Sequence, residues 1–97
     1  MNLDLSNALK VYLGADEDGG FQPIYCEKRL RAAFPSDYSR VIDLINPYLS
    51  EYQEPDWSNG DLVQETNRFA STLEKKFPEL DTIAIRALAN RWSYAWK

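Results

Sequence analysis

Residues 61–78 read DLVQETNRFASTLEKKFP, and apolar side chains return in this stretch every three or four positions. That spacing places them on one face of an α-helix, whereas a half-buried strand would alternate apolar and polar residues. The predicted buried face consists of Leu62, Thr66, Phe69, Ala70, Leu73 and Phe77. Asp61 stands just before this face, where its carboxylate can accept a hydrogen bond from the first helical turn. Pro78 disfavours helical geometry in the residue before it, so the helix is expected to end at Phe77.

The same ending occurs earlier in the chain. The pattern Leu-x-x-x-Phe-Pro is found at 30–35 and again at 73–78, and a new apolar run follows each copy within a few residues. Both copies predict a helix end, at Phe34 and at Phe77, and a short link to the next helix. A repeat array needs about three units. The two copies therefore predict two helix pairs or corners, and coincidence explains their likeness as well as duplication does.

Three further runs have helical spacing. The first is expected from about Asn2 to Leu13, with Gly14 as its C-cap and a loop of glycines and carboxylates to residue 20. The second is expected to open near Pro23 and to run to Phe34. The third begins after Ser36 or Asp37 and carries an apolar face of Tyr38, Val41, Ile42, Ile45, Tyr48, Leu49 and Tyr52.

A fifth helix is expected to start near Leu80 or Asp81 and to continue towards the C-terminus. Its predicted buried face is Ile83, Ala84, Ala87, Leu88, Trp92 and Ala95, with Trp96 as a further member. We expect the rings of Phe34, Phe69, Phe77 and Trp92 to meet the apolar face of the third helix in the core.

Pro47 lies inside the third run, where proline removes a backbone donor and clashes with the preceding turn. A kink or a break is therefore expected near Asn46. Period-two alternation with turn dipeptides, which would indicate a sheet, is not sustained anywhere in the sequence. A chain of 97 residues suits one domain. We predict a single all-α domain over residues 1–97, a compact bundle of about five short helices with the third kinked or split at Pro47.

The composition argues against several classes of function. The chain has no histidine and one cysteine, Cys26, which removes histidine-activated nucleophiles and the usual zinc sites. A calcium loop starting at Asp16 fails because Phe21 takes the sixth position, where such loops need glycine. We therefore predict no metal or cofactor and favour a protein that is not an enzyme.

Charge and hydropathy bear on partners and location. The net charge of −4 disfavours a nucleic-acid binder, which needs a concentrated positive face. No apolar stretch reaches the ~20 residues that cross a bilayer, and the start of the chain lacks the pattern of a signal peptide. These features, with the lone thiol, predict a cytoplasmic protein without a membrane span. Cys26 itself is expected to be a small buried hydrophobe, with Lys28 and Arg29 pointing elsewhere.

Residues 51–61 offer the best candidate for a binding surface. The segment combines rings with carboxylates: Glu51, Tyr52, Glu54, Asp56, Trp57 and Asp61. An aromatic anchor inside an acidic rim suits a partner protein with a basic surface. The leading hypothesis is a non-catalytic interaction protein, such as a small acidic inhibitor, antitoxin or immunity-type protein. The alternative for this segment is that Trp57 covers the core while the carboxylates are solvated.

Two other classes of function stay open. One is a small-molecule-binding protein or small enzyme with a pocket between helices, whose polar groups would come from Tyr12, Tyr25, Tyr38 or Tyr48. The other is a homodimeric structural protein, because the last helix is rich in rings and small residues that allow a second helix to approach.

Overall fold

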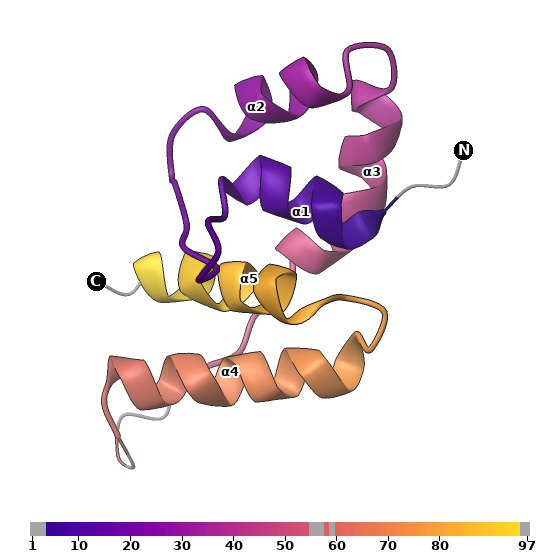
Figure 1. Ribbon diagram of the computed structural model, residues 1–97. Coiled ribbons are helices and arrows are strands. Elements are labelled where there is room, and N and C mark those ends of the chain that lie inside the picture. The colour runs from indigo at the N-terminus through magenta and orange to yellow at the C-terminus, as the bar shows by residue number, and fades with distance from the viewer. Residues whose placement is uncertain (1–3, 55–57, 59, 96–97) are drawn as a thin grey trace.

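The computed structural model describes residues 4–54, 58 and 60–95, and in these ranges it contains helices and no strand. The helices in chain order are α1 (Leu5–Leu13), α2 (Cys26–Ala33), α3 (Tyr38–Leu49), α4 (Leu62–Lys76) and α5 (Thr82–Tyr94) (Figure 1). The prediction of an all-α bundle of about five short helices is confirmed. In the described ranges, no helix combines the length and the apolarity that crossing a membrane requires.

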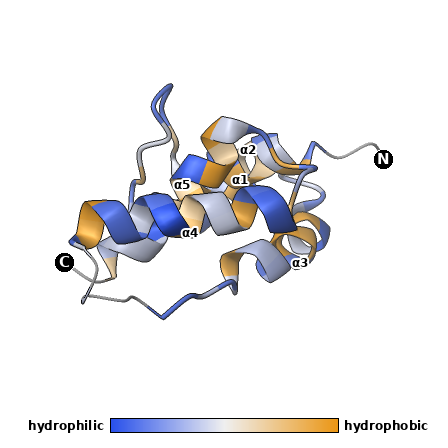
Figure 2. Cartoon of the chain, turned by 90° about the horizontal axis from the view of Figure 1, so that it is seen from below, coloured by the Kyte–Doolittle hydropathy of each residue, from blue (hydrophilic) through white to orange (hydrophobic). Residues whose placement is uncertain are grey.

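The helices are stacked around α5. In Figure 1, α5 lies between α1 and α4, α2 covers the far side of α1, and α3 crosses one end of the stack. Helix α1 packs against α2, α3 and α5, while α4 packs against α5 as its antiparallel neighbour. Figure 2, seen from the side of α4, shows hydrophilic residues along the outer side of that helix. Such a pattern is expected of a helix that buries only one face.

Helix α5 is buried on more than one side because it lies between two layers. Its residues Ala84, Ala87 and Ala89 are fully buried, and Ile85 and Trp92 are 2% and 5% exposed. Small side chains allow neighbouring helices to approach closely. The predicted face of α5 thus holds for Ala84, Ala87, Leu88 and Trp92. Ile83 is only half-buried and Ala95 is exposed, while Trp96 lies outside the described residues. The rest of the core comes from Ala8, Leu9, Leu13, Leu30, Val41, Ile45, Leu49, Phe69, Ala70, Leu73 and Leu80.

The helix ends follow local chemistry. The carboxylates of Asp4, Asp61 and Asp81 each accept a hydrogen bond from the first turn of the helix that follows, at 3.0, 3.0 and 2.8 Å. Phe34 and Phe77 end α2 and α4 with nearly the same backbone angles, φ −131° and ψ 65° against φ −126° and ψ 68°. The predicted role of the two Phe-Pro pairs as helix ends is confirmed.

Three predicted boundaries are wrong or incomplete. Helix α1 starts at Leu5 instead of Asn2, because Asp4 is its cap. Helix α2 starts at Cys26 and not near Pro23, because Tyr25 turns the chain in the left-handed region, with φ 64°. Helix α3 continues through Pro47 to Leu49 and is not split. The proline lies in the last turn, so little of the helix follows the backbone hydrogen bond that it removes; a kink there stays a prediction.

Arg29 ties the end of α1 to the segment that leads into α2. Its Nε donates to the carbonyl oxygen of Val11 at 3.1 Å, and its Nη2 donates to that of Tyr12 at 2.9 Å. Nη2 also donates to the carbonyl oxygen of Gln22 at 2.9 Å, and Nη1 to that of Ile24 at 2.6 Å. A cation at the C-terminus of a helix is also stabilised by the helix dipole. One side chain therefore closes the loop between α1 and α2.

Gly14 makes room for this guanidinium. A Cβ atom at Gly14 would lie 2.8 Å from the Cζ atom of Arg29, and the residue has a φ of 64°. Both the left-handed backbone and the close approach of Arg29 thus favour glycine at the end of α1.

We expect Arg29→Met to lower the free energy of unfolding by about 2–4 kcal/mol, because four carbonyl oxygens lose a charged donor. Urea denaturation followed by circular dichroism measures the change. The matched control is Arg40→Met at an exposed position of α3, which should shift stability by no more than about 0.5 kcal/mol. Equal losses in the two variants would contradict the role of Arg29.

Candidate functional site

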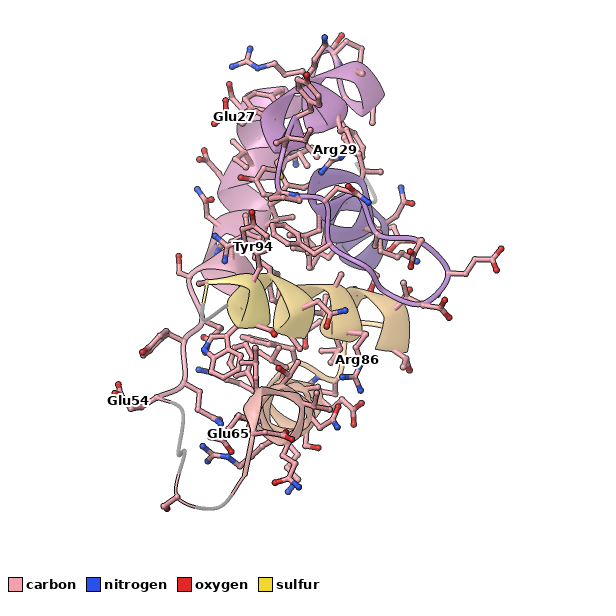
Figure 3. The ribbon with its side chains drawn as sticks, turned by 90° about the vertical axis from the view of Figure 1, so that its left-hand side faces the viewer. Glu27, Arg29, Glu54, Glu65, Arg86 and Tyr94 are labelled. Atoms are coloured by element: carbon pink, nitrogen blue, oxygen red, sulfur yellow. The ribbon has the colours of Figure 1, made fainter. Side chains whose placement is uncertain are left out.

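All five helices line one open cleft of about 1100 Å³. The cleft lies where the C-terminal ends of α3 and α5 come close to the start of α2 and the segment before it. Figure 3 is a view from this side of the molecule, with Tyr94 at the C-terminal end of α5. Concave, largely apolar sites of this kind are the usual location of ligands and binding partners.

The floor of the cleft is part of the hydrophobic core. Phe69, Leu88 and Trp92 line it and are at most 5% exposed. The rings of Phe69 and Trp92 are 5.1 Å apart between centroids and tilted by 35°. The indole Nε1 of Trp92 donates a hydrogen bond to the carbonyl oxygen of Gln53 at 3.0 Å. The floor is therefore apolar and held in place by core packing.

Tyrosine rings form the rim. Tyr25, Tyr52 and Tyr94 line the cleft and are 66%, 58% and 51% exposed. Phe21 stands edge-to-face against Tyr94, with ring centroids 5.7 Å apart. Exposed aromatic surface around a concave floor is typical of protein-binding hot spots.

Tyr25 has strained backbone geometry. Its φ of 64° and ψ of 22° are unusual for a bulky residue. The ammonium group of Lys28 lies 5.6 Å from the centre of its ring. Strain of this kind costs about 1–3 kcal/mol and occurs most often at binding and switching sites. The position of Tyr25 at the rim agrees with that tendency.

The charged side chains of the cleft are more basic than acidic. Its lining includes Lys28, Arg31 and Arg91 against Glu27 and Glu51. The carboxylate of Glu51 forms a salt bridge with the Nζ of Lys76 at 2.8 Å. The cleft therefore has an excess of positive charge in a chain whose net charge is −4.

Three tyrosines of the cleft have raised pKa values; Tyr52 is exposed, whereas Tyr12 and Tyr48 are half-buried. Burial raises the pKa of Tyr12, negative charge at Cys26 and Glu27 raises it further, and the positive charge of Arg91 opposes the shift. Burial, together with the hydrogen bond donated to the Glu79 carboxylate at 2.9 Å, raises the pKa of Tyr48 to about 12. Both hydroxyls are therefore protonated near neutral pH and serve as hydrogen-bonding groups instead of as bases.

Cys26 is not the core residue that the sequence predicts. It is half-buried, lines the cleft, and its Sγ donates to the carbonyl oxygen of Gln22 at 3.4 Å. Arg29 does not point elsewhere, since its Nη2 lies 3.5 Å from the sulfur. The reason is the late start of α2, which places Cys26 in its first turn against the preceding loop.

Only some of the residues predicted to bind a partner line the cleft. Glu51 and Tyr52 line the cleft, and the hydroxyl of Tyr52 donates to the carboxylate of Glu54 at 3.4 Å. Glu54 points away from the body of the molecule (Figure 3). Asp61 caps α4 instead of facing the cleft. Asp56 and Trp57 lie outside the described residues.

Three of the four tyrosines predicted to line a pocket do line the cleft. Tyr12, Tyr25 and Tyr48 line the cleft, whereas Tyr38 does not and instead packs under the guanidinium of Arg31, 4.1 Å from the ring centre.

Phe21, Arg91 and Tyr94 also line the cleft, although they are not among the residues predicted from the sequence. An aromatic residue directly after the glycine-rich loop was a usable signal for Phe21. No pattern in the sequence points to Arg91.

The chain matches no protein-family model, and no curated protein or solved structure is significantly similar to it. The cleft and its surroundings are therefore the basis for inferring a function.

We expect Tyr48→Phe to change the pH dependence of stability. The folded pKa is raised from 10.0 to about 12, so the stabilisation is fully present below pH 10 and is lost as the pH rises to about 12. The difference in unfolding free energy between wild type and Tyr48→Phe should shrink by roughly 1 kcal/mol over that window, after allowance for solvent screening. Urea unfolding at a series of pH values measures it.

The variant Glu79→Gln tests the cause of this shift. It keeps the tyrosine but removes the carboxylate, so tyrosinate absorbance should appear at a lower pH than in the wild type. Parallel stability curves for wild type and Tyr48→Phe would contradict the assignment.

Proposed function

We propose that this domain is a non-catalytic protein-binding module and that its partner docks on the aromatic cleft. The observation that carries the proposal is the rim, where Tyr25, Tyr52 and Tyr94 each expose more than half of their surface beside an apolar floor. Burying such rings against a partner would contribute binding free energy in proportion to the apolar area removed from water.

The chemistry of the cleft supports binding more than catalysis. The sequence has no histidine, and the thiol of Cys26 contacts Arg29 and a backbone carbonyl. The hydroxyls of Tyr12 and Tyr48 hold their protons more tightly than usual. Glu51 is engaged by Lys76. A general base or an activated nucleophile has little support among these groups.

The acidic segment beside the cleft supports one form of this function. A small inhibitor, antitoxin or immunity-type protein would place the exposed carboxylate of Glu54 opposite a basic surface of its target. Asp56, which lies outside the described residues, would add a second negative charge to the segment. The net charge of −4 would steer such a target towards the domain. A lone thiol fits a reducing, cytoplasmic setting for this encounter.

A small molecule is the second candidate occupant. The volume of about 1100 Å³ is close to the upper end of ligand pockets, and Tyr12 supplies a hydroxyl to the lining. A homodimer is the third alternative, in which a second copy covers the rim tyrosines.

The rim can be tested by capture of proteins from a lysate of the native source. We expect Tyr94→Asp to reduce retention of a specific partner at least about tenfold, because a charge replaces a ring at the edge of the interface. The matched control is Val63→Asp, at a residue of α4 that is 68% exposed and does not line the cleft. It should retain the partner as the wild type does.

Equal retention by Tyr94→Asp and wild type would contradict docking on the cleft. A rise in melting temperature with one compound of a metabolite panel, without a retained protein, would favour the small-molecule alternative. A dimer in sedimentation that Tyr94→Asp dissociates would favour the homodimer.

A separate prediction concerns the acidic segment and the rate of association with the partner. Glu54→Lys combined with Asp56→Lys should slow association with the captured partner and flatten the dependence of the association rate on salt, with the fold intact. Stopped-flow mixing at low and high salt measures both effects. An unchanged association rate would count against a basic partner surface opposite these residues.

A further inference from the structure

Arg91 is a half-buried cation without an acidic partner in the described part of the chain. It lies on α5, lines the cleft and donates from Nη1 to the carbonyl oxygen of Leu49 at 2.8 Å. The salt bridges among the described residues involve other cations, Lys10, Arg68 and Lys76. A guanidinium has five N–H donors in a fixed fork, so most of its donors remain available to an occupant of the cleft.

Tyr12 and two further cations also line the cleft, as does the carboxylate of Glu27 on α2. The hydroxyl of Tyr12 makes no hydrogen bond to a described residue, and the charge of Arg91 acts on it. Lys28 and Arg31 line the α2 side, each over a tyrosine ring and neither within salt-bridge distance of a described carboxylate. Positive charge above an apolar floor favours an occupant that is apolar with one negative group.

We propose that the cleft takes an apolar side chain of a partner polypeptide that stands next to an aspartate or glutamate, and that Arg91 binds this carboxylate with the help of the Tyr12 hydroxyl. This inference rests on the proposed function and names the chemistry of the partner. A planar carboxylate matches the fork of a guanidinium and can accept two parallel hydrogen bonds. The apolar neighbour would lie on Leu88 and Trp92.

The extent of the rim favours a polypeptide over a free acid. A small acid bound between Arg91 and the floor would leave much of the ring surface of Tyr25 and Tyr52 in water, because these rings are 66% and 58% exposed. A chain that continues on both sides of the anchor covers them. The partner would thus place an acidic group inside the cleft, while any basic surface would face Glu54 outside it.

The experiment is a selection of short random peptides displayed on phage against the wild-type domain. We expect the enriched peptides to place Asp or Glu next to a large apolar residue. The most enriched peptide and its counterpart with Asn or Gln in place of the acid are then titrated into the domain, with the indole N–H of Trp92 followed by NMR. The acidic peptide should bind about tenfold more tightly, equivalent to about 1.4 kcal/mol.

Variants of α5 test whether the tighter binding of the acidic peptide depends on Arg91. Arg91→Gln should abolish the preference for the acidic peptide, and Arg91→Lys should restore part of it, because the charge returns without the fork. The matched control is Arg86→Gln. Arg86 donates to Asn67 at 2.8 Å and lies on the other side of α5 from Tyr94 (Figure 3), so the preference should be kept. Thermal melting confirms that each variant is folded.

The outcomes separate this inference from the proposed function. Enriched peptides that lack an acid, or equal binding of the two peptides at the cleft, would overturn the inference and leave docking on the cleft in place. No enrichment at all would overturn both. Displacement of the acidic peptide by decanoate, with tighter binding of decanoate that depends on Arg91, would overturn the polypeptide occupant.

Discussion

The arrangement of the N-terminal half depends on one guanidinium. Arg29 satisfies two carbonyl oxygens at the end of α1 and two in the segment before α2. These contacts fix where Tyr25 reverses the chain and where Cys26 begins α2. The same segment forms one wall of the cleft. The shape of the cleft therefore depends on hydrogen bonds made by Arg29, a residue that does not line it.

The second constraint is the position of α5 between α1 and α4. Burial on both sides explains the fully buried alanines of this helix. Its C-terminal half lines the cleft: Leu88 is in the floor, and the end of the helix supplies three further residues, Arg91, Trp92 and Tyr94. A helix whose middle is packed on both sides can hold these three side chains in fixed positions. This is the kind of preorganisation that reduces the entropic cost of binding.

The sequence predicts what local chemistry determines and misses what depends on tertiary contacts. Helical spacing and the Asp61 cap locate α4, and proline places the helix ends at Phe34 and Phe77. The left-handed turn at Tyr25 was not predictable, because a contact of Arg29 across the loop stabilises it. The cleft was foreseen only as a pocket lined by tyrosines. Its actual lining joins residues from all five helices, which no periodicity connects.

Trp92 is part of both the hydrophobic core and the floor of the cleft. A substitution that reshapes the floor therefore disturbs the packing with Phe69 as well. Tolerance to substitution is consequently concentrated in the rim, where a tyrosine can be exchanged without opening a cavity. Under the proposed binding function, a new target would be acquired by altering a few exposed rings, whereas the surface beneath them is fixed by the requirement to fold.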